Sequence, residues 1–387
     1  MKRAIVLLCL ALAASADDLQ RANELAWAKR FAEAEAMYRA LPPSPASTLG
    51  LARVVMWQGR YAEAIALFET LEGVDALEGK AQAQYWSGDW RAAAANFRRV
   101  LALDPNRDEA RRSLAEIVAT TRPSQRVTVA GTTDDQPLEL IRTEVAATVF
   151  SDPQTRWTAS LGRYDGDASG EFASVANETT IRGLVVNGSL GIFTWPDGVR
   201  RPIGSASVRR GTLSARIERV PEIATATSFD THAASTLAAL RWETNRRWLA
   251  AAEVNQRSYS DDNQGWAAFA YAMAPLRKNE WTFWGGGAFA AKDTEESRFF
   301  GGRYDPYWTP QDLVEARAVV AVQRGPIKAH ADAGWARDWG RTYRPWRAGL
   351  IASFPVARGF GLETGMERSV TVDYRATSFY ASLVRRR

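Results

Sequence analysis

The chain has 387 residues, of which 24% are charged and 46% are hydrophobic. This composition excludes a disordered chain, and the length suits about two domains. The formal net charge of +5 is small for this length, and the one dense run of basic residues is Arg385–Arg387. Nothing in the charge pattern therefore indicates nucleic-acid binding.

The first 16 residues have the features of a secretory signal peptide. Two basic residues come first, residues 4–14 are apolar, and Ala14-Ser15-Ala16 is a small-residue cleavage site. A membrane anchor would need about 20 apolar residues. A lipoprotein signal would need a small residue at Leu8, before Cys9. Since Cys9 is the sole cysteine, the mature chain has no disulfide, no thiol nucleophile and no cysteine-based metal site.

Residues 17–120 are rich in Ala, Leu and Glu and contain an internal repeat. Each of three copies has an aromatic residue, then a small residue, then a second aromatic residue. These are Phe31, Ala34 and Tyr38; Tyr61, Ala64 and Phe68; and Trp90, Ala93 and Phe97. Gly59 and Gly88 precede the last two copies and suit a helix end with positive φ. The pattern predicts stacked helical hairpins, in which small residues let helices approach and aromatic residues fill the gaps.

This pattern resembles the tetratricopeptide repeat. The third copy is followed by Leu103-Asp104-Pro105, which is similar to the family's proline-terminated ending. The spacing of about 30 residues is shorter than the usual 34, and the shortening falls at Pro42–Pro45 and Glu72–Val74. Residues 108–118 are expected to form a closing helix. The alternative is an unrelated bundle of α-hairpins. Under both interpretations this part binds another chain and catalyses nothing.

After a linker at residues 121–124, residues 125–387 alternate with the two-residue period of β-strands. In residues 327–335, Ile, Ala and Trp form one face, opposite Lys, His and Asp. Runs of about 9–12 residues with tryptophan near their ends are typical of a transmembrane β-barrel, which is apolar outside and polar or small inside. We count roughly 14–17 runs and expect 16 strands, because bacterial single-chain barrels have an even number. The predicted fold class is α + β multidomain, an N-terminal α-solenoid followed by an antiparallel barrel.

A soluble sandwich or propeller is the alternative to the membrane barrel, but its strands are usually shorter, about 5–6 residues. Turns are expected at residues 261–263, 277–279 and 358–359. Outer-membrane barrels usually end in a strand with a terminal aromatic residue, whereas this chain ends in three arginines. We therefore expect the last strand to end at Leu383 or Val384, with the arginines as a tail.

A signal peptide, a short tetratricopeptide array and a barrel together resemble the YaiO-type outer-membrane β-barrel family. More distantly they resemble the outer-membrane exporters of poly-N-acetylglucosamine and cellulose. Residues 301–311, which begin Gly301-Gly302, are similar to a Gly-Gly-Tyr-Tyr-Ser-Pro-Gln type of segment in those exporters. Tyr304, Tyr307 and Trp308 are candidate polysaccharide contacts, because aromatic planes suit the C–H faces of sugar rings. They could equally anchor a turn at the barrel rim.

We expect no enzymatic activity and no cofactor. Barrel enzymes that cleave or transfer acyl chains need a Ser–His pair on one face. His232 and Ser235 are three residues apart, so they point to opposite faces of a straight strand. His330 shares a strand face with Asp332, but that strand has no serine. No metal site is expected, although the acidic turn at residues 261–263 could bind Ca²⁺ weakly.

The candidate lumen residues carry charges of both signs: Glu315, Arg317, Lys328, His330, Asp332 and Arg347. A balanced lining predicts a hydrated pore or a lumen braced by salt bridges. We expect an outer-membrane protein whose repeats lie in the periplasm and bind protein partners, and which exports or secretes an envelope polysaccharide. Its expected partners are membrane lipid and an exopolysaccharide, and not nucleic acid. The alternative is a non-transporting anchor or assembly protein with a plugged barrel.

Overall fold

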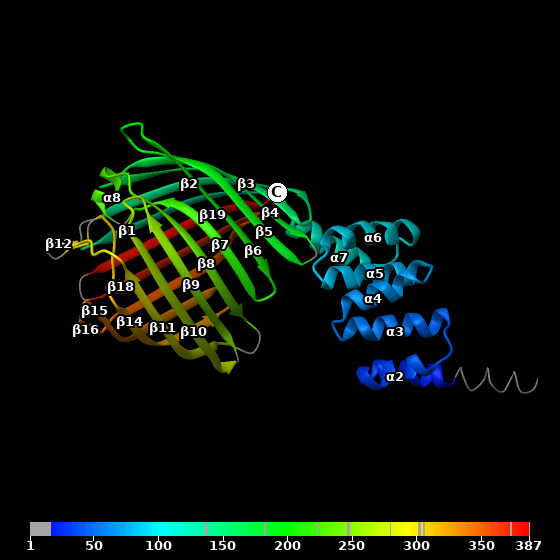
Figure 1. The fold of residues 1–387 in the computed structure, drawn as a ribbon. Helices are drawn as coiled ribbons and strands as arrows, with labels where there is room; N and C mark the ends of the chain where they lie inside the picture. Colours follow the sequence, from blue (N-terminus) through cyan, green and yellow to red (C-terminus); the bar gives the residue numbers. More distant parts are fainter. Residues whose placement is uncertain are drawn as a thin grey trace, which may run out of the picture. The chain divides into compact units, whose positions relative to one another are not determined.

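The computed structural model describes residues 17–135, 138–181, 183–223, 225–245, 248–278, 280–300, 303–304, 306–371 and 374–386. They form two compact units, a helical unit up to Thr121 and a β-barrel from Arg122 onward (Figure 1). The predicted signal peptide at residues 1–16 lies outside the described residues. Within the described residues, no helix has the length and apolar character needed to cross a membrane.

The helical unit is a stack of antiparallel helices. Residues 17–27 are helical. The following helices are α2 (Phe31–Ala40), α3 (Pro45–Trp57), α4 (Tyr61–Glu69), α5 (Val74–Trp86), α6 (Trp90–Leu103) and α7 (Asp108–Thr120). Successive helices pack on one another, and α5 also contacts α3 and α7, as in a solenoid of hairpins. Gly59 and Gly88 adopt the predicted positive φ, 81° and 85°, and Lys29 adopts φ 60° at the equivalent turn.

The residues of the sequence repeat form the helical core. Ala34, Ala64 and Ala93 are fully buried at 0% exposure. The second aromatic residue of each copy is also buried: Tyr38 at 3%, Phe68 at 2% and Phe97 at 0%. Neighbouring helices make room for two of these rings with glycine. A Cβ on Gly50 would lie 2.4 Å from the Tyr38 ring, and one on Gly79 would lie 2.4 Å from the Phe68 ring.

Sixteen long antiparallel strands close into the barrel, which confirms the predicted fold class and strand number. They are β1 (Ser124–Asp134), β2 (Glu139–Asp152), β3 (Thr155–Gly166), β4 (Gly170–Ile181), β5 (Leu184–Thr194), β6 (Arg200–Arg210), β7 (Leu213–Pro221), β8 (Ala234–Thr244), β9 (Leu249–Tyr259), β10 (Gln264–Lys278), β11 (Thr282–Thr294), β14 (Leu313–Arg324), β15 (Ile327–Asp338), β17 (Trp346–Ala357), β18 (Phe360–Val370) and β19 (Arg375–Arg386). The pairing of β1 with β19, from Ser124↔Arg386 to Asp134↔Ala376, closes the sheet.

The barrel strands present one apolar face and one polar face. Large apolar side chains project outward, including Leu161 at 65% exposure, Leu190 at 80% and Leu240 at 62%. On β15 the predicted alternation holds: Ala333 and Trp335 are exposed, whereas the intervening Gly334 and the flanking Asp332 are less so. An apolar outer surface around a closed sheet is the arrangement of an outer-membrane β-barrel.

The two ends of the barrel differ in the length of their connections. At one end, which we call the turn end, the hairpins β2–β3, β6–β7, β14–β15 and β17–β18 are joined by two residues each. The other end, the loop end, carries the α8 loop (residues 222–233, with α8 at Ala226–Asp230) and the long loop (residues 295–312, with β12 at Phe299–Phe300 and β13 at Arg303–Tyr304) (Figure 1). A short strand, β16 (Arg341–Tyr343), pairs antiparallel with the last residues of β15, Ala336–Asp338, at the loop end.

Two predicted element ends need correction. Strand β19 runs to Arg386 and does not stop at Leu383 or Val384, because Arg385 and Arg386 pair with Gln125 and Ser124 of β1. The backbone pairing that closes the barrel therefore continues into the arginines, whose long side chains can reach water or lipid headgroups from a strand end. Strand β10 continues to Lys278, so the turn predicted at residues 277–279 begins later. The turns at residues 261–263 and 358–359 lie between strands as predicted.

Candidate functional site

A network of ion pairs covers the inner face of strands β14, β15, β17 and β18. At its centre is Asp332, whose side chain is 1% exposed. One carboxylate oxygen of Asp332 accepts from Arg317 Nη1 at 2.6 Å, and the other accepts from Arg347 Nε at 2.9 Å. Arg317 also pairs with Glu315 on its own strand. The two guanidinium groups balance the negative charge of the buried carboxylate and occupy both of its oxygens. A buried charge needs such partners, because it has lost its contact with water.

The network continues toward β18 through a histidine. His330 Nε2 lies 3.0 Å from Glu367 Oε2, and Arg347 Nε lies 3.8 Å from the same carboxylate. We call these six residues the charged wall: Glu315, Arg317, His330, Asp332, Arg347 and Glu367. The structure thus brings five of the six predicted lumen residues together. The sixth, Lys328, is exposed closer to the turn end.

A second charged cluster lies on strands β7, β8 and β9. The Glu253 carboxylate, with a side chain 10% exposed, pairs with Arg216 at 3.2 Å and Arg241 at 3.5 Å. Arg241 also pairs with Glu243 at 2.9 Å. The alternation of apolar and polar residues along β9 predicts that Glu253 faces away from the apolar side. Its ion-pair partners lie on other strands, and no pattern in the sequence identified them. Both clusters bring acids and bases together, so the lining is polar without one dominant sign.

The barrel encloses a cavity beside the charged wall. This cavity has a volume of about 430 Å³ and is lined by Arg142, Tyr164, His330, Glu367 and Tyr380, among others. These residues come from β2, β3, β15, β18 and β19. The lining combines aromatic rings with charged groups, a combination that suits polar ligands with some apolar surface.

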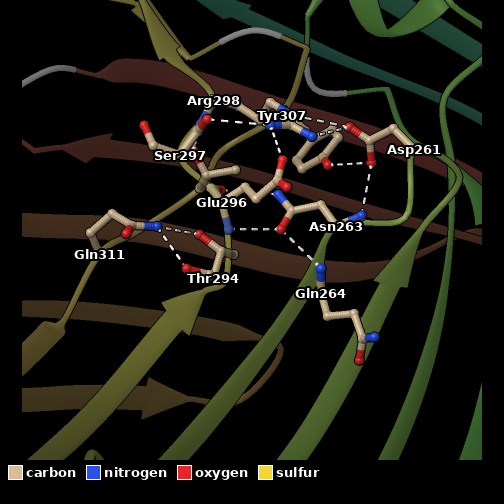
Figure 2. Close-up of polar contacts among 10 residues, drawn as sticks. Asp261, Asn263, Gln264, Thr294, Glu296, Ser297, Arg298, Tyr307 and Gln311 are labelled. Carbon is tan, nitrogen blue, oxygen red and sulfur yellow. Dashed lines mark hydrogen bonds and ion pairs between the residues drawn. The ribbon is translucent and has the colours of Figure 1, made fainter.

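At the loop end, Tyr307 fixes the long loop to the β9–β10 turn (Figure 2). The Tyr307 ring stacks on Tyr259 with centroids 3.8 Å apart, and its hydroxyl donates to Asp261 Oδ1 at 2.7 Å. Arg298 Nη2 lies 3.0 Å from Asp261 Oδ2. Burial acts to raise the pKa of Asp261, but the hydrogen bonds from Tyr307 and Arg298 outweigh it and lower that pKa. Both oxygens of the Asp261 carboxylate already have protein partners, Tyr307 and Arg298. This argues against the weak Ca²⁺ binding considered for this turn.

Asn263 adds a second attachment of the long loop (Figure 2). Its side chain is almost fully buried, with the residue 2% exposed. The Asn263 amide donates to the Glu296 carbonyl at 3.0 Å and accepts from the backbone N–H groups of Gln264, at 2.9 Å, and Glu296, at 3.0 Å. Gln311 secures the far end of the loop by donating to Thr294 Oγ1 at 2.8 Å. Both ends of the long loop are thus bonded to the barrel rim.

The candidate sugar contacts have different positions in the structure. Tyr307 is 2% exposed, so it cannot stack on a sugar in this conformation, and it serves as an anchor of the loop. Trp308 is 40% exposed, and the ammonium of Lys292, on β11, lies 4.3 Å from its ring centroid. The Tyr304 side chain, with Gly301, Gly302 and Asp305 of the same motif, lies outside the described residues.

The α8 loop is attached to an aromatic cluster at the same end of the barrel. Phe229 of α8 is 5% exposed and packs on Phe193 of β5, with ring centroids 6.2 Å apart. His232 Nε2 lies 2.8 Å from Asp197 Oδ2, in the β5–β6 loop. The Thr225 hydroxyl donates to the Pro306 carbonyl at 2.6 Å, which joins the α8 loop to the long loop. The two long connections thus hold each other at the barrel mouth.

The serine and histidine residues considered for nucleophilic catalysis have other partners. Ser235 donates to Glu222, and Arg257 Nη1 donates to the Ser235 hydroxyl at 2.9 Å. His232 contacts Asp197, and His330 contacts Glu367. These contacts bring no histidine to Ser235, so the geometry offers no support for a Ser–His pair there.

No protein-family model and no curated protein matches the chain. The fold is similar to solved outer-membrane structures. A bacterial polysaccharide outer membrane secretin matches with a TM-score of 0.55 and 12% identity, over 69% of this chain and 99% of that chain. CdiB from Acinetobacter baumannii matches with a TM-score of 0.44 and 8% identity, over 68% of this chain and 60% of that chain. OpdK from Pseudomonas aeruginosa matches with a TM-score of 0.37 and 9% identity, over 68% and 98%.

Together, the closed sheet, its apolar outer face and the first of these similarities define the chain as a protein with an outer-membrane β-barrel fold.

Proposed function

We propose that this chain is an outer-membrane conduit that exports an envelope polysaccharide. The observation that carries the proposal is the fold similarity to a polysaccharide secretin, over 99% of that chain at a TM-score of 0.55. The more distant resemblance of the sequence to the outer-membrane exporters of poly-N-acetylglucosamine and cellulose points the same way. We propose no enzymatic step, because export needs a path and not a reaction.

The charged wall supports a path for a hydroxylated polymer. Asp332, Arg317 and Arg347 are already paired, so a passing neutral sugar need not separate charges to reach hydrogen-bonding groups. Hydroxyl groups can donate to the carboxylates and accept from the guanidinium groups that line the wall. A lumen without one dominant sign also avoids trapping a charged solute.

The asymmetry of the barrel ends supports an orientation. Outer-membrane barrels have short periplasmic turns and longer extracellular loops. The turn end, where β1 begins at Ser124 and β19 ends at Arg386, would then face the periplasm. The helical unit precedes β1 directly in the chain and would lie in the periplasm as well. Its buried repeat residues fit tetratricopeptide-like packing, which suits a role in docking periplasmic partners.

Single-channel conductance in planar bilayers tests the conduit. The protein should give discrete openings, and Tyr307→Ala should increase the open probability, because it removes the stacking on Tyr259 and the hydrogen bond to Asp261. Phe354→Ala is the matched control, since that aromatic side chain is 40% exposed on the outer face of β17. Soluble oligosaccharides added to the bath should interrupt the current through the Tyr307→Ala pore.

The second candidate is a non-transporting anchor or assembly protein. Both long loops are attached to the barrel rim and to each other, which favours this candidate. Loops fixed in this way hold the barrel mouth in one conformation, as suits a barrel through which no substrate passes. No conductance steps from either the native protein or Tyr307→Ala would support the anchor and refute export. Conductance that oligosaccharides never interrupt would refute the sugar path and leave a general pore.

A further inference from the structure

The turn end of the barrel carries an excess of basic side chains. Exposed arginines stand at the strand ends and in the turns there: Arg209, Arg210, Arg277, Arg358, Arg385 and Arg386. Within the described part of the chain, no carboxylate pairs with any of these six. The described carboxylates near this end already have partners, and they are Asp152, Glu178, Glu243, Glu280 and Glu363. The turn end is therefore a positively charged rim, which attracts anionic groups.

A groove lies on the outer face of the barrel beside this rim. It has a volume of about 560 Å³, and its lining is almost wholly apolar. The side chains that line it come from β5 to β9 and include Val208, Leu213, Leu240, Trp242 and Val254. Leu213 and Leu240 are each 62% exposed, whereas Ala215 and Ala252 are small and leave space between such neighbours. Lipid chains cover the outer face of a membrane barrel, so the groove opens toward hydrocarbon.

Arg210 stands where the groove meets the charged rim. It is the last residue of β6 and pairs with Leu213 across the β6–β7 turn, and Leu213 pairs in turn with Trp242 of β8. These three residues form one row across three strands. Trp242 is 41% exposed on the outer face, and tryptophan in such a place marks the level of the lipid headgroups. The register therefore puts a guanidinium group at the headgroup end of an apolar groove.

The other charged residues that border the groove are already paired. Arg241 and Glu253 contribute to its lining, and they pair with each other at 3.5 Å. Glu253 also pairs with Arg216, and Arg241 also pairs with Glu243. Two arginines and two glutamates add no net charge, so the uncompensated charge of the described groove comes from Arg210. The neighbouring turns contain further basic residues outside the described part of the chain, at Arg182, Arg246 and Arg247.

We propose that the groove holds an acyl chain of an anionic phospholipid whose phosphate pairs with Arg210, an inference that rests on the proposed orientation of the turn end toward the periplasm. The apolar groove favours the chain, because each methylene buried there is removed from polar surroundings. A guanidinium group can donate two parallel hydrogen bonds to one phosphate. The charged rim attracts lipids with a net negative charge and repels the ammonium of a zwitterionic headgroup.

Other occupants fit this site less well. A peptide on the hydrocarbon-facing side of a closed sheet would leave backbone groups without hydrogen bonds. A second copy of the barrel, packed here about a two-fold axis, would bring two positive rims together, and they would repel each other. A phosphorylated glycolipid of the outer leaflet would meet the loop end in the proposed orientation. A phospholipid supplies both a chain for the groove and a phosphate at the level of Arg210.

The test is lipid binding to the full-length protein in detergent, measured by native mass spectrometry. Phosphatidylglycerol is the anionic probe, phosphatidylethanolamine is the zwitterionic comparator, and lipid A is the phosphorylated glycolipid. Phosphatidylglycerol should bind most tightly of the three. Arg210→Gln should weaken its binding about 5-fold, the scale of one basic residue at an anionic lipid surface. Arg210→Lys should retain most of the affinity, because the positive charge remains.

Arg358→Gln is the matched control for charge, since it removes an arginine from the same rim at the β17–β18 turn, outside the groove. Ala215→Phe tests the groove itself, because a ring there should fill the hollow and weaken binding while Arg210 is kept. Ala238→Phe is its control, on the outer face of β8 but outside the groove lining. Equal losses within either pair of variants, or equal affinities for phosphatidylglycerol and phosphatidylethanolamine, would overturn the inference.

Tighter binding of lipid A than of phosphatidylglycerol would identify a glycolipid site and would also overturn the inference. Binding in detergent does not depend on transport, so this proposal and the export proposal fail separately. Binding that depends on Arg210, in a protein without conductance, would refute export and support the lipid site. Conductance in a protein without such binding would refute the lipid site and support export.

Discussion

Glu35 shows how single side chains hold the helical unit together. Its carboxylate joins three segments, α2 through Arg39, the end of α3 through Gln58, and the start of α4 through Arg60. Burial acts to raise the Glu35 pKa, but the hydrogen bonds from Gln58, Arg39 and Arg60 outweigh it and lower the pKa from 4.5 to about 2. The ionised form is therefore favoured in the folded state.

This lowered pKa makes the helical unit sensitive to acid. A carboxylate with a lowered folded-state pKa stabilises above its unfolded value and loses that contribution as the pH falls. We expect Glu35→Gln to lower the free energy of unfolding by about 1–2 kcal/mol at pH 7, after discounting for the exposed arginines. The native protein and the variant should converge between pH 4.5 and pH 2. Unfolding followed by far-UV circular dichroism at 222 nm measures this difference in stability, with Glu72→Gln as an exposed control. A difference between the native protein and Glu35→Gln that persists at pH 2 would contradict the prediction.

Lys29 occupies a backbone conformation that the other two hairpins give to glycine. Its φ is 60°, against 81° for Gly59 and 85° for Gly88. The left-handed conformation costs a residue with a Cβ roughly 1–2 kcal/mol. We therefore expect Lys29→Gly to raise the free energy of unfolding by about 0.5–1 kcal/mol, and Gly59→Ala to lower it by a similar amount. Urea titration of the helical signal measures both, and a destabilised Lys29→Gly would show that the side chain stabilises the turn.

On β15 the alternation places Ala331 outward and His330 inward, beside Glu367. An arginine at Ala331 should cost about 2–4 kcal/mol if the position lies near the bilayer midplane. His330→Arg should fold, because the arginine guanidinium can pair with the Glu367 carboxylate, which lies 3.0 Å from His330 Nε2. Folding yield into lipid vesicles compares the two variants, and equal yields would mean that β15 has no lipid face.

The structure changes one expectation that the strand pattern alone suggests. An arginine at Asp332 would be harmless in a merely wet lumen. Asp332 instead has a side chain only 1% exposed and accepts from Arg317 and Arg347. A third guanidinium at this place would leave two arginines without their shared carboxylate, so Asp332→Arg is a poor control for the lipid face.

Strand faces could be predicted from the sequence because their signal is local. The two-residue period fixes which side chains share a face, and one buried or lipid-covered face fixes the register. The helical core could also be predicted, since each copy has a buried alanine equivalent to Ala64 and a buried aromatic residue equivalent to Phe68. The long loop was not, because Tyr307 takes its partner Asp261 from 46 residues earlier in the chain. No periodicity marks such a contact, and an exposed aromatic motif looks the same in the sequence as a buried anchor.

At the scale of the whole molecule, closure of the sheet between β1 and β19 removes every exposed edge among the long strands. Polar side chains add to this seam: Thr128 bonds Ser382 at 2.8 Å, and Thr132 bonds Ser378 at 3.0 Å. A closed barrel in lipid resists detergent until it is heated. We expect the protein to fractionate with the outer membrane and to migrate differently on a gel before and after boiling. Recovery from the soluble periplasmic fraction would contradict the barrel's membrane setting.

The division into two units predicts two unfolding transitions. The helical unit buries small alanines and aromatic rings, whereas the barrel is held by a closed hydrogen-bonded sheet. Urea should therefore abolish the helical circular dichroism signal while the barrel stays folded in detergent. Ala93→Trp should shift only this first transition, by about 1–3 kcal/mol, because a large ring overpacks a site with 0% exposure.

Ala64→Trp should give the same result, since Ala64 occupies the equivalent place in the preceding copy and is also 0% exposed. Ala238→Trp is the control in the barrel, where an outward-facing tryptophan on β8 meets detergent and requires no space in a core. The gel shift on boiling follows the barrel, and the signal at 222 nm follows the helices. If Ala93→Trp moved both transitions together, the two units would unfold as one cooperative structure, and the repeat stack would owe its stability to the barrel and not to its own core.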